Sequence, residues 1–227
     1  MQKELELFLQ LHKLFASHSF KLFLVGGTVR DYLLKLPLED MDAVTNATPD
    51  EMKEFLKDAN YAFSKYGSVS LKLDGVKFDI TTLREEEFYK DSRHPLEVKF
   101  VKDLSVDVKR RDFSVNALYM DNEFHVIDLV DGVNDLNDHI LRMIGDPDER
   151  LLEDPLRIIR ALRFSVDYDL KIDEELSESI KRNISLLDKL NPEKIKMDLK
   201  KIKCLDKNKV TNKFSEYNIK HLLDVIE

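Results

Sequence analysis

The sequence has 227 residues, 43% of them hydrophobic and 35% charged, and a formal net charge of −8 at pH 7. That length allows one large or two small domains, no apolar run approaches the about 18 residues that a membrane span needs, and the acidic, amphipathic N-terminus is a poor signal peptide. The lone Cys204 excludes a disulfide framework and a multi-cysteine zinc site. We therefore expect a protein of the reducing cytoplasm with no membrane partner.

The first part of the chain alternates short strand and helix signals. Thr48 and Glu51 form a capping box with Pro49 in the first turn, which predicts a helix start. Asp74-Gly75 lies between two alternating segments and predicts a two-residue β-hairpin. In chain order, the other expected elements are a buried strand (21–27), a helix (28–36), a strand (40–45) and the two hairpin strands (68–73 and 76–83).

The pattern then changes twice. The charged segment 84–97 is typical of a loop or mobile element, and strands near 97–101 and 124–128 are expected around a helix near 111–120. From Asp148 onward, the leucine and isoleucine spacing is helical only, over 149–165, 173–187, 192–205 and 214–226. We predict an α+β fold with a small β-sheet domain over 1–145 and an all-helical region over 146–227.

Asp40 and Asp42 are spaced by one residue on an expected strand. Side chains alternate along a strand, so these two share one face while Met41 and Ala43 take the other. Carboxylates this close repel unless a cation or proton lies between them, and Mg²⁺ accepts such ligands together with phosphates and water. The pair is a candidate metal site, although the spacing is also common by chance. On the second hairpin strand, Asp79 is either a third carboxylate of this site or a solvent-facing residue.

Glycines and arginines supply candidate phosphate ligands. Gly26-Gly27 closes a strand before a helix that carries Arg30, where backbone N–H groups favour phosphate; the alternative is a simple tight turn. The P-loop and dinucleotide-binding motifs are both absent from the sequence. Arg110-Arg111-Asp112 offers donors for phosphate and an acceptor for a ribose hydroxyl, and its alternative is a surface ion pair.

Asp154 and Arg157 suggest selection of a base. A carboxylate accepts from an exocyclic amine and a guanidinium donates to a ring nitrogen, which suits cytosine and adenine and leaves uracil and guanine unpaired. Asp154-Pro155 is equally a plausible helix start. Arg160 and Arg163 continue from Arg157 as a helical stripe about 120° wide, which either holds a triphosphate or is an exposed basic face.

Six segments, taken in order, resemble one family. They are LVGGTVRD (24–31), EDMDAVTNATP (39–49), DITTLREEEFYKDSRHP (79–95), RRDFSVNAL (110–118), DLNDHILRMIGDP (135–147) and LLEDPLRIIRALRF (151–164). Over roughly residues 20–200, the chain resembles the bacterial-type (class II) tRNA nucleotidyltransferases, or CCA-adding enzymes, and their poly(A) polymerase relatives in the polymerase β-like superfamily. The resemblance implies a β-sheet nucleotidyltransferase head followed by a helical neck and a truncated body.

The resemblance also implies a reaction and its residues. The reaction would be template-independent addition of C and A to a tRNA 3′ end from CTP and ATP with Mg²⁺, releasing pyrophosphate. By position, the family pattern implies metal carboxylates at Asp40 and Asp42, triphosphate contacts at Gly27, Arg30 and Arg111, a ribose neighbour at Asp112, a base-selecting pair at Asp154 and Arg157, and nucleotide support at Arg160 and Arg163. We group Asp79 with Asp40 and Asp42 as catalytic.

The sequence departs from the family pattern at its C-terminal end. Family members continue through a helical body and tail, whereas this sequence stops at Glu227, as a compact form or a fragment. Segment 181–213 holds 11 Lys and Arg against 4 Asp and Glu, a balance of 11 − 4 = +7, and is either an RNA-binding surface or a solvated helix face. The alternatives are a poly(A) polymerase, an enzyme that adds only C or only A, and a non-catalytic nucleotide- or RNA-binding subunit of a split enzyme. A homodimer or a partner subunit is also considered.

Overall fold

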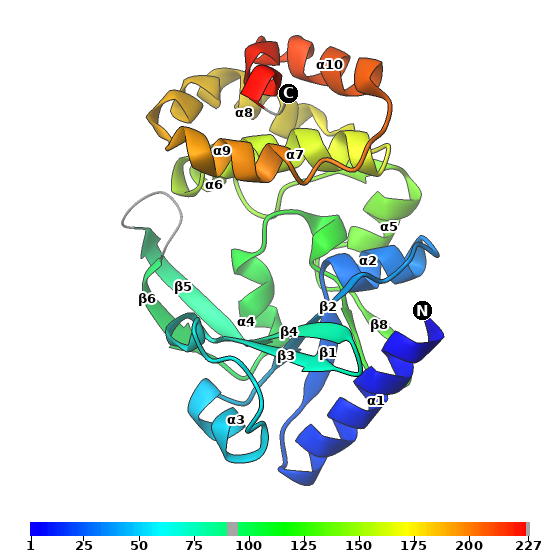
Figure 1. Ribbon diagram of the computed structural model, residues 1–227. Coiled ribbons are helices and arrows are strands. Elements are labelled where there is room, and N and C mark those ends of the chain that lie inside the picture. Colours follow the sequence, from blue (N-terminus) through cyan, green and yellow to red (C-terminus); the bar gives the residue numbers. More distant parts are fainter. Residues whose placement is uncertain (90–94, 226–227) are drawn as a thin grey trace. The chain divides into compact units, whose positions relative to one another are not determined.

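The computed structural model describes residues 1–89 and 95–225 (Figure 1). The chain forms two compact units: residues 1–88 with 95–133 make up the first, and the chain from 134 onward lies in the second. The first unit contains a six-stranded sheet, and the second is built mainly of helices. The predicted α+β class is therefore confirmed.

The sheet of the first unit has the strand order β3-β4-β2-β1-β7-β8. Its neighbours are antiparallel except for β2 and β4, which run parallel. The parallel pair places Asp42 opposite Asp79 and Asp40 opposite Lys77. The strands are β1 (Leu22–Val25), β2 (Asp40–Thr45), β3 (Ser68–Leu73), β4 (Val76–Thr82), β7 (Tyr119–Met120) and β8 (Val126–Ile127).

One face of this sheet is closed by the N-terminal helix α1 (Gln2–Ser17). Its Phe8 and Phe15 are fully buried and belong to the same core as Met41 of β2 and Phe78 of β4. Because strand side chains alternate, the acidic residues of β2 and β4 lie on the opposite face from this core. The predicted shared face of Asp40 and Asp42 is thereby confirmed.

Local signals in the first unit also hold. Helix α2 (Gly27–Leu33) follows β1, and helix α3 (Pro49–Phe55) begins with the expected capping box between Thr48 and Glu51. Asp74 and Gly75 both have positive φ, 47° and 87°, as a tight hairpin turn with a primed geometry requires.

The predicted loop over 84–97 is wrong where the structure describes it. Strands β5 (Arg84–Tyr89) and β6 (Pro95–Phe100) pair as a two-stranded sheet, and residues 90–94 lie outside the described chain. Two of the charged residues that suggested a loop form an ion pair, because Arg84 Nη2 lies 2.6 Å from Glu86 Oε1. Strand β6 includes most of the strand expected near 97–101.

The predicted helix near 111–120 is also wrong. This segment forms a short 3₁₀ turn over Ser114–Asn116 and then strand β7. Every residue from Phe113 to Met120 is buried, so the run carries no amphipathic period that distinguishes a helix from buried irregular chain. The remaining elements of this unit are the helix α4 (Leu104–Asp107) and the 3₁₀ turns η1 (Ser64–Tyr66) and η2 (Val108–Arg110).

The second unit is less purely helical than predicted, because β9 (Ile140–Leu141) and β10 (Lys171–Ile172) pair in parallel. The expected helix 149–165 is two helices separated at Asp154-Pro155. The expected helix 214–226 is wrong, because a helix capped by Asp206 begins earlier, at Lys207, and ends at Glu216, and a 3₁₀ segment follows over Lys220–Val225. The helices are α5 (Gly132–Asn137, at the boundary of the units), α6 (Pro147–Glu153), α7 (Leu156–Asp167), α8 (Glu174–Asn183), α9 (Pro192–Leu199) and α10 (Lys207–Glu216), with 3₁₀ segments η4 (Ile184–Lys189) and η5 (Lys220–Val225).

No helix in the described ranges 1–89 and 95–225 is both long enough and apolar enough to cross a bilayer.

Candidate nucleotide and metal site

Three carboxylates gather on the face of the sheet opposite the core. Asp42 and Asp79 are register partners on β2 and β4, and Asp40 stands opposite Lys77. Lys77 Nζ lies 2.6 Å from Asp79 Oδ2, so Asp79 is held by an ion pair in this structure. The face therefore carries three acids and one base within two strands.

The electrostatics of Asp42 reflect this crowding. Burial, together with repulsion from Asp79 and Asp40, raises the pKa of Asp42 to about 6, and the Arg111 guanidinium and Lys77 oppose the rise. A carboxyl with such a pKa is stabilised by a proton or by a cation. The donor set thus fits a divalent metal held by Asp40 and Asp42.

The carboxylates alone do not form a complete metal cage. Within the described chain, no three acidic, histidine or cysteine side chains converge closely enough to hold an ion by themselves. Mg²⁺ commonly uses only one or two protein carboxylates and completes its shell with water and substrate phosphates. Two carboxylates on one strand face match this small protein contribution.

The Gly26-Gly27 turn lies directly beside Asp42. A Cβ built on Gly26 would lie 4.0 Å from Asp42 Oδ2 and 3.9 Å from Arg111 Nη1. A Cβ built on Gly27 would lie 3.8 Å from the same carboxylate oxygen and 3.4 Å from Arg30 Nη2. Two guanidiniums and the half-buried Asp42 carboxylate thus meet at a backbone turn without side chains. The structure brings together Gly26, Gly27, Arg30, Asp42 and Arg111, five of the residues that the sequence singled out.

Arg30 is buried and oriented by neighbours on both sides. Its Nη1 donates to Asn116 Oδ1, and its Nε donates to Asp31 Oδ1 at 2.9 Å. Thr28 lies two residues before Arg30 in α2. Its Oγ1 accepts from the Asp42 N–H at 2.8 Å and donates to the Asp40 carbonyl at 3.2 Å. Helix α2 is therefore connected by hydrogen bonds to β2, the strand that carries Asp40 and Asp42.

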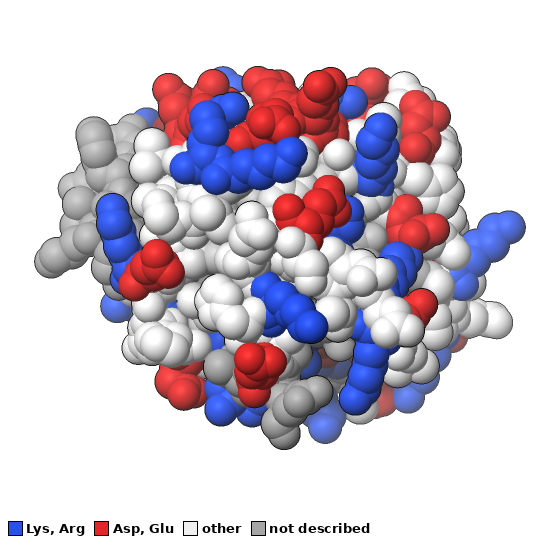
Figure 2. All heavy atoms as spheres, turned by 90° about the horizontal axis from the view of Figure 1, so that it is seen from above, with Lys and Arg blue, Asp and Glu red and all other residues white. Residues whose placement is uncertain are grey.

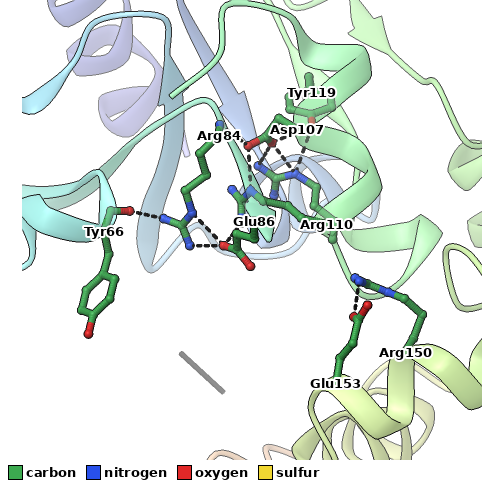
Figure 3. A network of polar contacts seen from close by, with 9 residues as sticks. Tyr66, Arg84, Glu86, Asp107, Arg110, Tyr119, Arg150 and Glu153 are labelled. Atoms are coloured by element: carbon green, nitrogen blue, oxygen red, sulfur yellow. Dashed lines mark hydrogen bonds and ion pairs between the residues drawn. The ribbon is translucent and has the colours of Figure 1, made fainter. Parts of the chain in front are cut away.

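Arg111 is held through a buried carboxylate, Asp107. Arg111 Nε and Nη2 donate to Asp107 Oδ2 at 3.0 and 2.9 Å, and the Tyr119 hydroxyl donates to the same oxygen at 2.9 Å. Attraction to Arg111 and Arg110 outweighs burial and lowers the pKa of Asp107 to about 2. Figure 3 shows Asp107 facing Tyr119 and Arg110 within this network.

The predicted group Arg110-Arg111-Asp112 is divided by the structure. Arg110 turns away to pair with Asp107 Oδ1 at 2.8 Å and with Glu86 Oε1 at 3.3 Å. Asp112 is half-buried and its Oδ1 accepts from the Phe113 N–H at 3.0 Å. Arg111 reaches the glycine turn, where its Nη1 lies 3.9 Å from the position of a Cβ built on Gly26.

In the second unit, Asp154 and Arg157 are both buried, at 7% and 4% exposure. Asp154 Oδ1 accepts from the Leu156 N–H at 3.1 Å, and Asp154 Oδ2 lies 2.5 Å from Arg160 Nη2. Asp154 therefore does contribute to the start of α7, as its helix-start interpretation expected, and it pairs with Arg160.

The arginine stripe on α7 is not an exposed basic face. Arg157 donates to the Arg150 carbonyl at 2.5 Å and to Glu153 Oε2 at 2.8 Å. Arg163 is half-buried with its guanidinium carbon 4.5 Å from the centroid of the Phe164 ring, and burial lowers its pKa. These cations are held in protein surroundings, which is where a selective contact gains strength.

The basic segment 181–213 is partly neutralised by local ion pairs. On the face presented in Figure 2, several basic side chains lie singly among uncharged residues, and others lie beside the acidic side chains that gather at one edge. Exposed pairs of this kind contribute little to stability and remain available for exchange with other anions. The pairs are Lys181–Glu178, Arg182–Asp148, Lys201–Asp198, Lys209–Asp169 and Lys213–Glu216.

Sequence reasoning missed four residues that position the site: Thr28, Asp107, Asn116 and Tyr119. Asp107 precedes Arg110 and Arg111 by three and four residues, a spacing that favours helical ion pairs and was a usable signal. The contacts of the other three join chain segments far apart in sequence, so no local pattern indicates them.

Comparison with known proteins agrees with this geometry. The family model for the Poly A polymerase head domain matches residues 22–142. The CCA-adding enzyme of Staphylococcus haemolyticus (strain JCSC1435) is 40% identical over 185 residues, covering 82% of this chain and 46% of that protein. The CCA-adding enzyme of Lactobacillus helveticus (strain DPC 4571) is 41% identical over 183 residues, covering 81% and 46%. The chain thus spans about half the length of these curated relatives.

Solved structures show the same fold. The Bacillus stearothermophilus CCA-adding enzyme in complex with CTP matches with a TM-score of 0.84 and 27% identity, over 96% of this chain and 56% of that one. The Thermotoga maritima CCA-adding enzyme complexed with tRNA matches with a TM-score of 0.78 and 25% identity, over 96% and 51%. Since the matched family model covers more than half of the sequence, the chain belongs to the Poly A polymerase head domain family.

Proposed function

We propose that the chain is a template-independent tRNA nucleotidyltransferase that adds C and A residues to a tRNA 3′ end, using CTP and ATP and releasing pyrophosphate. The observation that carries the proposal is the convergence of Asp42, Arg30 and Arg111 on the Gly26-Gly27 turn. Relatives named CCA-adding enzymes, and neighbouring structures solved with CTP or with tRNA, support the same reaction.

Asp40 and Asp42 would hold the metal, which we propose to be Mg²⁺. Enzymes of this family are generally metal-dependent, and oxygen ligands on one strand face are the type that Mg²⁺ prefers. When bound, the ion polarises the α-phosphate and favours the attacking 3′ oxygen. Asp79 would serve the same site as a third carboxylate, after exchange of its ion pair with Lys77.

The residues around the turn would hold the triphosphate. Arg30 presents its guanidinium beside Gly27 and Arg111 presents its own beside Gly26, and guanidiniums match phosphate oxygens in geometry and charge. Asp112 would accept from a ribose hydroxyl. These residues orient the α-phosphate for in-line attack by the RNA 3′-hydroxyl, so positioning and charge stabilisation supply most of the rate.

Asp154 and Arg157 would select the base. Binding of cytosine or adenine would exchange the Asp154–Arg160 pair and the Arg157–Glu153 pair for contacts with the base edge. Uracil and guanine would leave these buried groups unpaired, which is costly. Arg160 and Arg163 would support the nucleotide from the same helix.

The macromolecular partner would be the tRNA 3′ end, with the basic segment 181–213 holding the adjacent stem. We also propose association with a second copy of the chain or with a separate partner subunit. A tRNA substrate and the lone Cys204 both fit the cytoplasm.

The test is incorporation of labelled nucleotide into tRNA that lacks its 3′ CCA, with Mg²⁺ present. Sequencing of the 3′ ends should show CC with CTP alone, no addition with ATP alone, and CCA with both nucleotides. Long adenosine tracts would indicate a poly(A) polymerase instead, and addition of only C or only A would indicate a partial enzyme.

A folded protein that binds CTP but incorporates none, until a partner is supplied, would indicate one subunit of a split enzyme. If the folded protein neither binds CTP nor incorporates nucleotide, that result would contradict the proposal altogether.

A further inference from the structure

We propose that Asp107 is a positioning residue that aims Arg111 at the Gly26-Gly27 turn, so that the fully buried carboxylate governs triphosphate affinity without contacting the nucleotide. The inference rests on the proposed triphosphate contact of Arg111 and adds a residue that this contact requires.

The two oxygens of Asp107 are divided between different partners. Oδ2 accepts from Arg111 Nε and Nη2 and from the Tyr119 hydroxyl, all within 3.0 Å. Oδ1 accepts from Arg110 Nε at 2.8 Å and from the Arg84 N–H at 3.2 Å. Asp107 is 0% exposed, so Arg111 is bound by a carboxylate that lies inside the protein.

This contact determines which edge of the guanidinium faces the turn. Asp107 binds the edge formed by Nε and Nη2, while Nη1 lies 3.9 Å from the position of a Cβ built on Gly26. A planar guanidinium bound by two hydrogens on one edge has its plane and direction restricted. The direction of Nη1 toward the turn is therefore set by Asp107.

Tyr119 completes the support and links it to the turn. Its hydroxyl accepts from Arg111 Nε at 3.1 Å, and its ring centroid lies 5.0 Å from the Arg111 guanidinium carbon. On strand β7, Tyr119 is the register partner of Val25, and the neighbouring Leu118 carbonyl accepts from the Gly26 N–H at 3.1 Å. The segment that orients Arg111 thus also anchors the glycine turn.

Asp107 remains a carboxylate throughout the working range, because its guanidinium partners hold its pKa at about 2. Replacement by asparagine keeps the shape but puts an amide where two guanidiniums need an acceptor. Arg111 would then lose one charged acceptor, and its guanidinium would sample other directions.

The experiment compares Asp107→Asn with Glu86→Gln in the full chain. Glu86 pairs with Arg84 and Arg110 in the same network, whereas Arg111 donates to Asp107 and Tyr119, so Glu86→Gln serves as the matched control. Binding of CTP and of inorganic tripolyphosphate is measured by calorimetry, with thermal unfolding measured on the same samples. Tripolyphosphate lacks sugar and base, so it reports the phosphate contacts alone.

Asp107→Asn should weaken both ligands by about tenfold to a hundredfold, the scale expected when a binding group is misplaced, whereas Glu86→Gln should leave both affinities within about twofold. Asp107→Glu should restore part of the loss. If Asp107→Asn does not fold, Tyr119→Phe removes only the bridging hydroxyl and should produce a smaller loss in the same direction. Equal losses in the Glu86 and Asp107 variants, in step with their unfolding temperatures, would overturn the inference.

Arg111→Ala separates this inference from the proposed function. If Arg111→Ala leaves tripolyphosphate binding unchanged, the proposed phosphate contact itself is wrong. If Arg111→Ala weakens binding and Asp107→Asn does not, only the positioning role is wrong. In the Arg111→Ala background, Asp107→Asn should produce no further loss, because residues that act through one another are not additive.

Discussion

Asp42 and Asp79 face each other as register partners on two parallel strands, β2 and β4. This juxtaposition, together with burial, raises the pKa of Asp42 to about 6. The protein thus keeps a carboxyl where ionisation is unfavourable for folding, which is typical of a group retained for binding a cation.

Asp42→Asn should stabilise the metal-free protein at pH 7.5. The folded-state pKa of Asp42 lies above its ordinary value of 3.8, so the stability it contributes is present below about pH 4 and is lost as pH rises through 6. The free energy of unfolding of the variant should exceed that of the native sequence by roughly 2–3 kcal/mol at pH 7.5.

Unfolding by guanidinium chloride at pH 4 and pH 7.5, in the presence of a chelator, measures this difference in the free energy of unfolding. The gain should nearly vanish at pH 4, and the same change at exposed Asp58 should have little effect at either pH. A gain of the same size at both pH values would contradict the assignment.

Divalent cation should raise the unfolding temperature of the native protein at pH 7.5, because the ion replaces the proton that Asp42 otherwise favours. Thermal unfolding with and without Mg²⁺ measures the shift. Asp40→Asn and Asp42→Asn should each reduce it strongly, and an undiminished shift in both variants would place the ion elsewhere. Removal of metal by a chelator should also abolish incorporation.

Gly26→Ala should weaken CTP binding and destabilise the protein by roughly 1–3 kcal/mol. Gly26 has φ +66° and ψ −129°, a conformation that residues with a Cβ rarely adopt, and the new methyl would lie beside Asp42 and Arg111. Calorimetric titration with CTP and chemical unfolding give the two measurements.

The matched control for Gly26 is Gly75→Ala. Gly75 also has a positive φ, +87°, but a Cβ there would meet nothing within 4 Å. The Gly75→Ala variant should lose stability and retain its affinity for CTP. If both variants lose CTP affinity alike, the effect at Gly26 is one of general stability.

Asp154→Asn should reduce discrimination of CTP and ATP against UTP and GTP. The amide can donate as well as accept, so it no longer penalises a base that presents a carbonyl. It also weakens the acceptor for the Leu156 N–H and the pair with Arg160, so a loss of about 1 kcal/mol in stability is expected. Competition of the four nucleotides for one labelled analogue measures the discrimination.

Asp148→Asn is the comparison for this change. Asp148 accepts from Ser179, Arg182 and Asn183 in the same unit, so its loss disturbs packing between α6 and α8. The Asp148→Asn variant should keep the native ratio of CTP affinity to UTP affinity. An unchanged ratio in Asp154→Asn would remove Asp154 from base selection.

Local signals in the sequence were enough for several elements of the first unit. The alternation around Asp40 and Asp42, the capping box from Thr48 to Glu51 and the Asp74-Gly75 turn all depend on residues within a few positions of one another. Such interactions are present in the sequence itself, and strand β2 has the predicted bounds. The candidate arginines and glycines were named for their residue types and for the motifs around them.

Only the tertiary structure decided which of these residues meet. The parallel pairing of β2 with β4 puts Asp79 beside Asp42, and the fold brings Tyr119 and Asp107 behind Arg111 and Asn116 onto Arg30. Near 111–120 the structure has a turn and a strand in place of the expected helix. Residues 113–120 are all buried, so their hydrophobic pattern does not distinguish a helix from other buried chain. Contacts between distant segments depend on burial and pairing across the whole unit, which no short window of sequence contains.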